Sequence, residues 1–525
     1  MDATAFYREL LHIDQPHAHQ RTLFELLSTD PAPATLLRAP CGSGKTEAAV
    51  APFLHQFVTH DFVLAPRLIY VLPTRALCDT LAQRLARYAA AVHPRLVVEA
   101  HHGAHPAEPF FFSDVVVTTL DQFIYAYARA ASHLGSAGVG RHLDLPAGAI
   151  ANAFVVFDEA HMYEPYSHAL MRAMVELLFE ARVPFLFMTA TMPQALLADY
   201  SERTSFTRID YQAPSSATPP RQLSLEVYEE PLLSGAEAGA PPATLHPYAA
   251  DLLASHRRCL VVVNTVGRAQ AAYQAIRALR DDAMLIHARF TAADRHRLES
   301  AVAAGLGRAG PGGVVVSTQV CEAGLDITAD LLVTELAPAD ALVQRAGRCA
   351  RFGGAGRMLV FGADAAPYEP LSLEITRDHL RQHPSLQLAD WQATTAFVDR
   401  LPYRVEDLLA NDSLHDLYEA TLFADARPQR LSVRDGKPLY LWVKEEGERP
   451  DPATLHDHLL SIDIRQAGRL RALLDQEKVR LLWLQRHDDG SLREEPARDA
   501  SQVQPFRTYV LPRRLYDPKL GVVWP

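Results

Sequence analysis

Short apolar runs alternate with longer stretches in which apolar residues recur at helical spacing, up to Gly362. We predict strands at Leu68–Leu72, Val115–Val117, Phe154–Phe157, Phe185–Met188, Leu260–Val263, Met284–Ile286, Val314–Val316, Leu331–Val333 and Met358–Phe361. Strands whose side chains are nearly all apolar are buried on both faces, as parallel strands covered by helices are. The pattern therefore predicts an α/β fold built on parallel sheets.

The alternation is interrupted once and later fades. Between Tyr211 and Pro247 the chain carries seven prolines and two glycines, which is typical of a linker, with Leu223–Val227 as an embedded strand. A chain of 525 residues suits three domains of ordinary size. We expect two parallel-sheet lobes in tandem, residues 1–213 and 214–362, followed by a smaller mixed C-terminal accessory domain, residues 363–525.

Composition argues against membrane-spanning and disulfide-stabilised proteins. Hydrophobic residues make up 48% of the chain, and no apolar run approaches the ~18 residues of a membrane span. The first residues lack the apolar core of a signal peptide, so we expect a cytoplasmic protein without a membrane partner. Five scattered cysteines without a C-x-x-C pair argue for a reducing compartment and against a structural zinc site.

Charge is distributed unevenly along the chain. The net charge of −11 argues against a broad basic surface for duplex nucleic acid, but it allows a cleft that grips one strand through amides, hydroxyls and a few arginines. Lys45 is the only lysine in the first 436 residues. An ammonium kept where arginine is otherwise used indicates a compact position that a planar guanidinium cannot fill.

Lys45 lies in a phosphate-binding loop of the G-K-[ST] kind, residues Ala39–Thr46. A predicted strand, Thr35–Arg38, precedes the loop and a predicted helix, Thr46–Val58, follows it, so a helix N-terminus points at the anion. Lys45 is expected to reach the β- and γ-phosphates, and Thr46 to hold Mg²⁺. The amides that cradle the phosphates would be those of Cys41, Gly42, Ser43 and Gly44. The alternative is an ordinary glycine-rich turn with an exposed lysine.

Two adjacent carboxylates follow the predicted strand Phe154–Phe157, at the end where a parallel sheet places its chemistry. We expect Asp158 to bind Mg²⁺ and Glu159 to orient and deprotonate an attacking water. The alternative is an acidic pair at a helix start, where the helix dipole favours it.

Arginines close the second half of the pattern, in the segment Gln344–Arg351. Arg345, Arg348 and Arg351 are spaced three apart, which predicts that they share one helix face. They can supply positive charge to a phosphoryl group in transfer. The alternative is a solvated basic face of the helix.

These motifs together resemble those of superfamily 2 helicases of the DEAH type, in order and in spacing. The matching segments are Gln20 in the run PHAHQ, Ala39–Thr46, Pro73–Leu77, Thr118–Gln122, Asp158–His161, Thr189–Thr191, Asn264–Ala269, Ser317–Ile327 and Gln344–Arg351. Longer matches are similar to the helicase of type I CRISPR interference, the CRISPR-associated helicase-nuclease family. They are Thr118–Ala126, Asp158–Met174, His287–Phe290 with Arg295, and the tail Arg514–Trp524; Gly324 and Cys349-Ala350 depart from the family pattern.

The resemblance implies two RecA-like lobes that bind ATP and Mg²⁺ between them and contact single-stranded DNA. It implies that Gln20 reads adenine, that Lys45, Thr46, Asp158 and Glu159 run hydrolysis, and that Gly324 and Asp326 help to bind the nucleotide. Gln344, Arg348 and Arg351 would contact the γ-phosphate. The strand contacts would come from Thr74, Arg75, Thr119, Asn264, Thr265, Arg289 and Thr318. His161, Thr189 and Thr191 would couple the two sites.

The family usually carries a metal-dependent HD nuclease ahead of the helicase, whereas 38 residues precede Ala39 here. The dipeptides His415-Asp416, His456-Asp457 and His487-Asp488 do not predict a dinuclear metal site. We therefore expect an ATP-dependent single-stranded DNA translocase or helicase that unwinds target DNA in CRISPR interference. Its expected partners are the CRISPR surveillance complex and a separate HD nuclease subunit. The alternatives are a DEAH-type DNA-repair or RNA helicase outside CRISPR, and an ATP-gated nucleic-acid clamp without unwinding.

Overall fold

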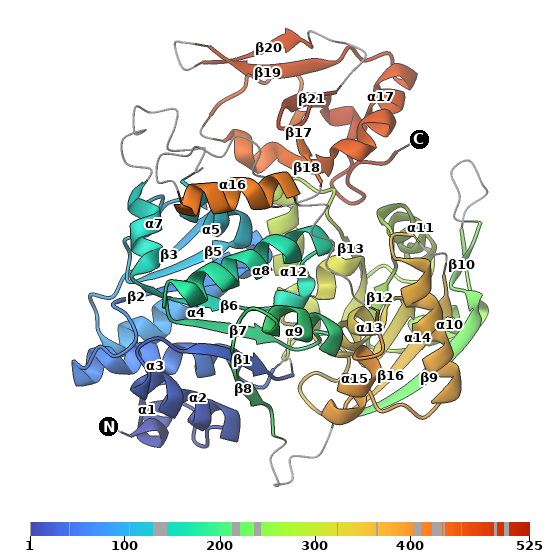
Figure 1. Ribbon diagram of the computed structural model, residues 1–525. Helices are drawn as coiled ribbons and strands as arrows, with labels where there is room; N and C mark the ends of the chain where they lie inside the picture. The colour runs from blue at the N-terminus through green and yellow to red at the C-terminus, as the bar shows by residue number, and fades with distance from the viewer. Residues whose placement is uncertain are drawn as a thin grey trace. The chain divides into compact units, whose positions relative to one another are not determined.

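The protein is described from a computed structural model, in which the chain falls into two compact units (Figure 1). The first unit joins Met1–Ala217 to Val398–Asp435, and the second joins Thr218–Phe397 to Gly436–Pro525. The three domains predicted from the sequence stay a prediction. The residues that the structure describes are 2–40, 42–103, 105–129, 144–212, 221–235, 243–322, 324–363, 366–402, 411–422, 433, 436–452, 454–487, 491–497 and 503–524.

An eight-stranded sheet with the order β4-β3-β5-β2-β6-β7-β1-β8 forms the centre of the first unit. All neighbouring strands pair in parallel except β3 and β4, which are antiparallel. The strands are β1 Ala34–Arg38, β2 Arg67–Leu72, β3 Val98–His102, β4 His105–Pro106, β5 Val115–Thr119, β6 Ala153–Phe157, β7 Phe185–Thr189 and β8 Thr207–Asp210. The parallel fold predicted from the apolar runs is confirmed here.

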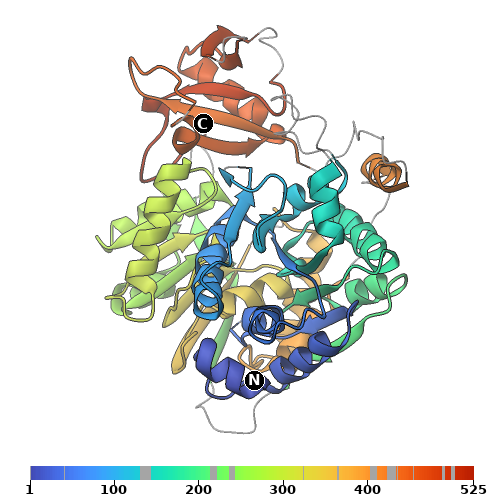
Figure 2. The ribbon, with the colours of Figure 1, turned by 90° about the vertical axis from the view of Figure 1, so that its left-hand side faces the viewer.

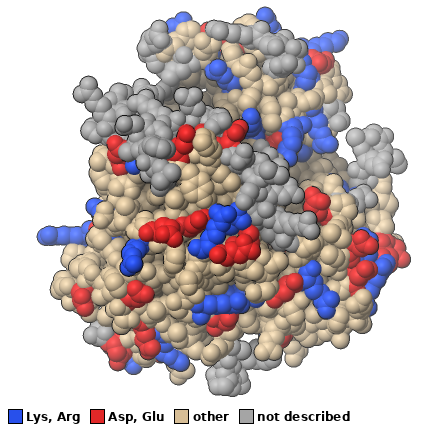
Figure 3. Space-filling model, in the orientation of Figure 1, with Lys and Arg blue, Asp and Glu red and all other residues tan. Residues whose placement is uncertain are grey.

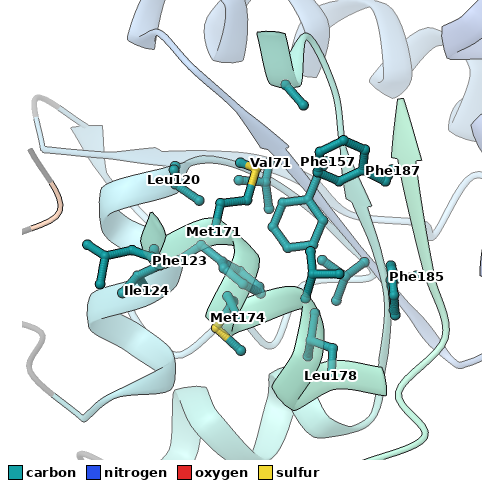
Figure 4. Packing of buried hydrophobic residues seen from close by; sticks show 14 of the residues in the cluster. Val71, Leu120, Phe123, Ile124, Phe157, Met171, Met174, Leu178, Phe185 and Phe187 are labelled. Atoms are coloured by element: carbon teal, nitrogen blue, oxygen red, sulfur yellow. The ribbon is translucent and has the colours of Figure 1, made fainter. Parts of the chain in front are cut away.

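Helices cover both faces of this sheet, which explains why its strands are apolar on every side. One face packs against α1 Ala3–Leu10, α2 Ala18–Thr29, α3 Lys45–Thr59 and α4 Arg75–Val92. The other face packs against α5 Leu120–Tyr127, α7 Asp144–Ala151, α8 Pro165–Glu180 and α9 Gln194–Ser201. Figure 4 shows this second core, in which Phe157 and Phe187 of the sheet meet Met171 and Met174 of α8.

A segment from far along the chain completes the first unit. The carboxylate of Asp399 accepts a hydrogen bond from Arg38 at 2.8 Å and caps the amide of Gln194 at 3.0 Å, so it ties the end of β1 to the start of α9. Helix α16, Asn411–Leu422, lies beside α8, where the hydroxyls of Tyr166 and Ser413 are 2.8 Å apart (Figure 2). Nothing in the sequence pattern predicted this return.

The second unit contains a six-stranded sheet, parallel throughout, with the order β13-β14-β12-β15-β16-β9. Its strands are β9 Gln222–Pro231, β12 Arg258–Val262, β13 Ala283–Ile286, β14 Gly313–Ser317, β15 Leu331–Glu335 and β16 Ala355–Gly362. The strand predicted inside the proline-rich segment is therefore confirmed as the edge strand β9. The helices of this unit include α10 Pro247–Ser255, α11 Val266–Arg277, α12 Ala292–Leu306, α13 Ala339–Ala346, α14 Pro370–Gln382 and α15 Trp391–Val398, and a short hairpin pairs β10 Leu233–Ser234 with β11 Thr244–Leu245.

A five-stranded mixed sheet forms the C-terminal part of the second unit, in the order β18-β17-β21-β19-β20. Trp442 is buried in its small core with Leu484 and Val510. The elements are β17 Pro438–Lys444, β18 Leu459–Asp463, α17 Ala467–Gln476, β19 Leu482–Arg486, β20 Leu492–Pro496 and β21 Thr508–Pro512. The predicted mixed character of the C-terminal region is confirmed.

The surface carries both signs of charge. On the face drawn in Figure 3, lysines and arginines alternate with aspartates and glutamates. Within the described ranges, no helix is long and apolar enough to cross a membrane.

Replacing Phe157 with alanine should destabilise the first unit by about 3–5 kcal/mol, because the ring is fully buried against Phe123 and Phe187. Phe62→Ala is the matched control, since that ring is 48% exposed, and it should cost less than about 1 kcal/mol. All four tryptophans lie in the second unit. In urea unfolding, the lower stability of the first unit should therefore appear in circular dichroism and not in tryptophan fluorescence. Equal losses of stability in Phe157→Ala and Phe62→Ala would contradict the assigned core.

Candidate functional site

The loop between β1 and α3 has the backbone that a phosphate-binding loop needs. Gly42 and Gly44 both have φ of +80°, a left-handed conformation that favours glycine. Gly44 is also the N-cap of α3, and a Cβ atom added there would collide with the amide of Gln20. Cys41 lies outside the described residues. The turn therefore aims the N-terminus of α3 across the carboxyl end of the sheet.

Lys45 and Ser43 present polar groups inside this loop. The Lys45 side chain is buried, and its Nζ donates to the carbonyl oxygen of Ala39 at 3.1 Å. The Ser43 hydroxyl is buried without a hydrogen-bond partner among the described residues. A buried hydroxyl usually has a partner, so its state here fits a loop that receives a polar ligand. The alternative of an ordinary turn with an exposed lysine is wrong, because Lys45 is 6% exposed.

Gln20 supports the loop from α2. Its Nε2 donates to the carbonyl oxygen of Gly44 at 3.1 Å, while its Oε1 accepts from the amide of His17 at 2.7 Å. The rings of His17 and His19 stack beside it with centroids 5.6 Å apart, and His19 lies 5.4 Å from Tyr211. Sequence analysis did not identify these three rings.

Asp158 directly follows β6. In the sheet, β7 lies between β6 and β1, the strand that leads into the phosphate loop. Its carboxylate is 6% exposed and accepts hydrogen bonds from the Tyr70 hydroxyl at 2.7 Å and from the Glu159 amide at 2.8 Å. Burial, and then the adjacent charge of Glu159, raise the pKa of Asp158, while the charge of Lys45 lowers it. The loop lysine and this carboxylate therefore belong to one electrostatic site.

Tyr70 joins the two residues expected to hold Mg²⁺. Burial and the charge of Asp158 raise the pKa of Tyr70 well above its ordinary value, and a hydrogen bond with Thr46 acts in the other direction. The phenol thus contacts the carboxylate of Asp158 and is also influenced by the side chain of Thr46. Sequence analysis missed it, although a polar tyrosine within the apolar run Leu68–Leu72 was an available signal.

Glu159 occupies a left-handed backbone conformation with φ of +52°, which is rare for a residue other than glycine, asparagine or aspartate. Strained backbone of this kind concentrates at functional sites. The Glu159 carboxylate lies 3.6 Å from Nε2 of His161. The alternative of an acidic pair at a helix start does not account for this conformation or for the burial of Asp158.

His161 links this carboxylate to the end of β7. Its Nδ1 is 3.3 Å from the hydroxyl of Thr189, which is fully buried, as Thr191 nearly is. Burial lowers the pKa of His161 to about 4, so the ring is neutral at neutral pH. Two of the three residues expected to couple the two sites, His161 and Thr189, are therefore brought together beside Glu159.

A second buried carboxylate near the loop escaped sequence analysis. Glu47, in the first turn of α3, is 3% exposed; it forms an ion pair with Arg84 of α4 and accepts a hydrogen bond from the Tyr88 hydroxyl at 2.8 Å. This pair joins α3, which follows the phosphate loop, to α4, which Thr74 caps and Arg75 begins.

The arginines of the second unit do not share one helix face, and that expectation is wrong. Helix α13 ends at Ala346, so Arg348 and Arg351 lie on the turn beyond it. A helical glycine at Gly347 and the turn that follows direct the chain back toward β16. Spacing alone could not show this end, because the residues around Gly347 are compatible with a longer helix.

Arg345 is fully buried at the centre of the second unit. Its guanidinium donates to Glu322 at 2.8 Å, to Thr334 at 2.8 Å, to Asn264 at 3.2 Å and to the Tyr368 hydroxyl at 2.8 Å. These bonds satisfy a buried cation and fix the loops after β12 and β14 against α13. Arg345, the first arginine of the predicted set, is therefore a structural residue.

Arg348 and Arg351 are held differently. Arg348 donates to the carbonyl oxygens of Cys321 at 3.0 Å and Glu322 at 2.6 Å, and no described carboxylate pairs with it. Arg351 lies 3.1 Å from Asp326, and its buried Nη1 has no hydrogen-bond partner among the described residues. Gln344 is 7% exposed at the end of α13, and Gly324 has φ of +83°.

The residues expected to contact a strand in the first unit lie at the ends of β2 and β5. Thr74 is the N-cap of α4 and accepts from the amide of Leu77 at 3.4 Å, while Arg75 is exposed. Thr119 is the N-cap of α5, and its buried hydroxyl has no hydrogen-bond partner in the described part of the chain.

The corresponding residues of the second unit are more deeply set. In the side chain of Asn264, Nδ2 donates to the Leu336 carbonyl oxygen at 2.8 Å and Oδ1 accepts from Arg345, so both polar atoms are hydrogen-bonded. Thr265 caps α11, Thr318 is 3% exposed, and Arg289 is 9% exposed. Whether these residues contact a strand stays a prediction.

Comparison with known proteins agrees with this site. The family model of the DEAD/DEAH box helicase matches residues 17–198, which contain the phosphate loop, Asp158 and Glu159. Fold and site together define an ATP-hydrolysing helicase with two parallel-sheet lobes. The family model of the CRISPR-associated nuclease/helicase Cas3, C-terminal, matches residues 255–354.

Curated relatives narrow the class. The chain is 30% identical over 475 residues to the CRISPR-associated helicase Cas3 of Thermoproteus tenax, covering 84% of this chain and 79% of that protein. It therefore belongs to the CRISPR-associated helicase Cas3 family, and the predicted helicase of CRISPR interference is confirmed. It is also 27% identical over 376 residues to the CRISPR-associated endonuclease/helicase Cas3 of Escherichia coli, covering 60% of this chain but only 40% of that longer protein.

Solved structures share the fold. The crystal structure of T. fusca Cas3-ATP matches with a TM-score of 0.69 at 19% identity, covering 98% of this chain and 69% of that one. A chain of a CRISPR RNA-guided surveillance complex, pre-nicking, matches with a TM-score of 0.61 at 19% identity, covering 97% and 70%.

Replacing Glu159 with glutamine should preserve ATP binding and abolish hydrolysis, because the amide keeps the shape of the side chain but is not a base. Lys45→Ala should abolish turnover, since the ammonium that is expected to face the phosphates is lost. Lys478→Ala is the control, because that lysine belongs to the C-terminal part of the second unit and to none of the motifs. Nucleotide binding and phosphate release measured in parallel separate the two effects; hydrolysis at the wild-type rate in Glu159→Gln would remove Glu159 as the base.

Proposed function

We propose that this chain uses ATP hydrolysis to move along single-stranded DNA and to unwind target DNA during CRISPR interference. The observation that carries the proposal is the grouping of Lys45, Thr46, Tyr70 and Asp158 beside the strained Glu159. One lobe thus offers a phosphate loop, a metal-binding pair and a base within a single electrostatic site.

The phosphates of ATP would lie against the amides of Gly42, Ser43 and Gly44, with Lys45 exchanging its carbonyl contacts for phosphate oxygens. Thr46 and Asp158 supply hydroxyl and carboxylate oxygens, the ligands that Mg²⁺ prefers. The metal, when bound, would offset charge on the phosphates. Glu159 would accept the proton of the attacking water, and neutral His161 would hold its carboxylate near Thr189.

Gln344, Arg348 and Arg351 are proposed to act on the γ-phosphate from the second lobe. Carbonyl oxygens hold Arg348 in place without neutralising its charge, and one nitrogen of Arg351 lacks a described partner. Cations held in this way can stabilise charge on a phosphoryl group in transfer. Gly324 and Asp326 lie in the loop that Arg351 contacts, and Gln20 is proposed to read adenine.

The strand is proposed to contact Thr74, Arg75 and Thr119 in the first lobe. In the second lobe the proposed contacts are Asn264, Thr265, Arg289 and Thr318. Most of these residues follow parallel strands at their carboxyl ends, where ligands of α/β sheets bind. The proposed partner assembly is a CRISPR surveillance complex in the cytoplasm, because one structural neighbour is a chain of such a complex.

We further propose that the nuclease acts from a separate subunit. Among the described residues, no three metal-ligating side chains come together. Each of these histidines instead lies beside a single carboxylate: His415 is 3.0 Å from Glu419, His456 is 3.3 Å from Asp457 and His487 is 2.9 Å from Glu495. Asp488 lies outside the described residues.

Single-stranded DNA should raise the steady-state ATPase rate by about tenfold or more, because the strand favours the closed arrangement of the lobes in which the arginines reach the nucleotide. Duplex DNA and single-stranded RNA of the same sequence are the matched competitors. Equal rates with and without nucleic acid would remove the translocase proposal. Stimulation without displacement of a labelled strand from a partial duplex would instead favour an ATP-gated clamp.

The purified chain should leave circular single-stranded DNA intact in the presence of Mn²⁺, Ni²⁺ or Co²⁺, with and without ATP. The reason is the scattered placement of its His-Asp dipeptides. Agarose gels over a time course provide the measurement, with a pancreatic-type DNase as positive control. Cutting that disappears in His415→Ala or His456→Ala would show that these histidines are metal ligands.

A further inference from the structure

The C-terminal tail, residues Tyr516–Trp524, is fastened to the loop His287–Thr291 of the second unit. The Tyr516 hydroxyl accepts from the amide of Thr291 at 3.1 Å and donates to Asp294 at 2.7 Å. The carbonyl oxygen of Leu520 lies 3.0 Å from Nε2 of His287. These bonds join one end of the tail to the loop and to the N-terminus of α12.

Two further features bring the tail against the loop backbone. Gln270 of α11 donates to the carbonyl oxygens of Leu520 at 2.7 Å and Val522 at 3.0 Å, and the Val522 amide donates to the carbonyl oxygen of Arg289 at 3.3 Å. Gly521 has φ of +70°, and a Cβ atom there would lie 2.5 Å from the carbonyl oxygen of Arg289. Only glycine permits this close approach.

The tail ends with Trp524 against the side chain of Arg289. The guanidinium carbon lies 5.4 Å from the centroid of the indole ring, within the range of a cation–π contact. The Arg289 side chain is nine-tenths buried, yet none of the described residues gives its guanidinium a hydrogen bond or an ion pair. A buried cation is normally paired with an acid, so this one is held ready for an anion from outside the chain.

The electrostatic surroundings of Arg289 agree with this. Burial, and then the positive charge of Arg469 on α17, lower the pKa of Arg289 to about 10, so it stays charged at neutral pH. No carboxylate is among the groups that shift it. The positive charge of Arg469 therefore adds to that of Arg289 around the Arg289 guanidinium.

We propose that the tail is the positioning element of the strand site, and that Trp524 orients Arg289 toward a phosphodiester of the single strand. The inference rests on the proposed function and adds residues to its strand site that no motif includes. Arg289 binds the phosphate, while Trp524 acts through Arg289 by fixing the plane of the guanidinium, which limits the freedom lost on binding.

The test is binding of the full chain to a fluorescein-labelled oligodeoxythymidylate, measured by anisotropy over a range of salt concentrations. Trp524→Ala and Arg289→Ala should each weaken binding roughly tenfold. Each should also lower the slope of log affinity against log salt by about 0.7, the value for one phosphate of a single strand. Trp524→Phe retains an aromatic face and should stay within about threefold of the wild type. Val523→Ala, at an exposed neighbour in the same tail, should match the wild type.

The double variant separates positioning from an independent contact. If Trp524 acts through Arg289, Trp524→Ala should add little to Arg289→Ala. Additive losses, or an unchanged salt slope in Trp524→Ala, would overturn the inference. Gly521→Ala should reproduce the loss of Trp524→Ala, because it forces the tail away from Arg289. If the wild-type chain itself does not bind the strand, the proposed function fails together with the inference; if it binds and the variants equal it, only the inference fails.

Discussion

The buried carboxylate of Asp158 is the charge on which the first unit depends. A carboxylate taken out of water is costly unless hydrogen bonds and opposite charge surround it, and here Tyr70, the Glu159 amide and Lys45 share that task. Each of the three comes from a different place in the chain. Satisfying this one group therefore fixes the phosphate loop, the middle of β2 and the end of β6 relative to one another.

The second unit also contains a buried charge that its neighbours must compensate, but there the charge is positive. Arg345 is a fully buried cation, and its donors are used by Glu322, Thr334, Asn264 and Tyr368. Because these partners lie in or after different strands, the cation holds the carboxyl end of the sheet together. Arg348 and Arg351, beyond the helix end, are held by fewer partners, which is why they and not Arg345 are the proposed contacts of the γ-phosphate. An account that treats the three arginines as equivalent would misjudge what Arg345→Ala does, since it would remove a structural centre rather than a ligand contact.

Local patterns predicted much of this protein, and long-range contacts explain the rest. Apolar runs predicted the parallel strands, and the sequence around Lys45 predicted a glycine-rich loop between a strand and a helix, because both depend on neighbours in sequence. Tyr70, Glu47 and Arg84 escaped because their partners lie on other elements, 37 or more residues away. The return of Asp399 to Arg38 spans 361 positions, and no periodicity carries information over that distance. The end of α13 at Ala346 was misjudged because helical spacing cannot show where a turn begins.

The net charge of −11 is compatible with the proposed binding of a polyanion for a physical reason. Many surface arginines of this chain lie within ion-pair distance of a carboxylate, as Arg357 does with Glu226 and Arg280 with Asp282. The electrostatic field of such a pair is weak a few ångströms away, because the two charges offset each other and physiological salt screens what is left. A cation without a described ion-pair partner keeps more of its field, so in the proposed function a few residues such as Arg289 would set where phosphate is attracted. The path of a bound strand would then depend on which arginines lack a carboxylate partner, rather than on the total number of basic residues.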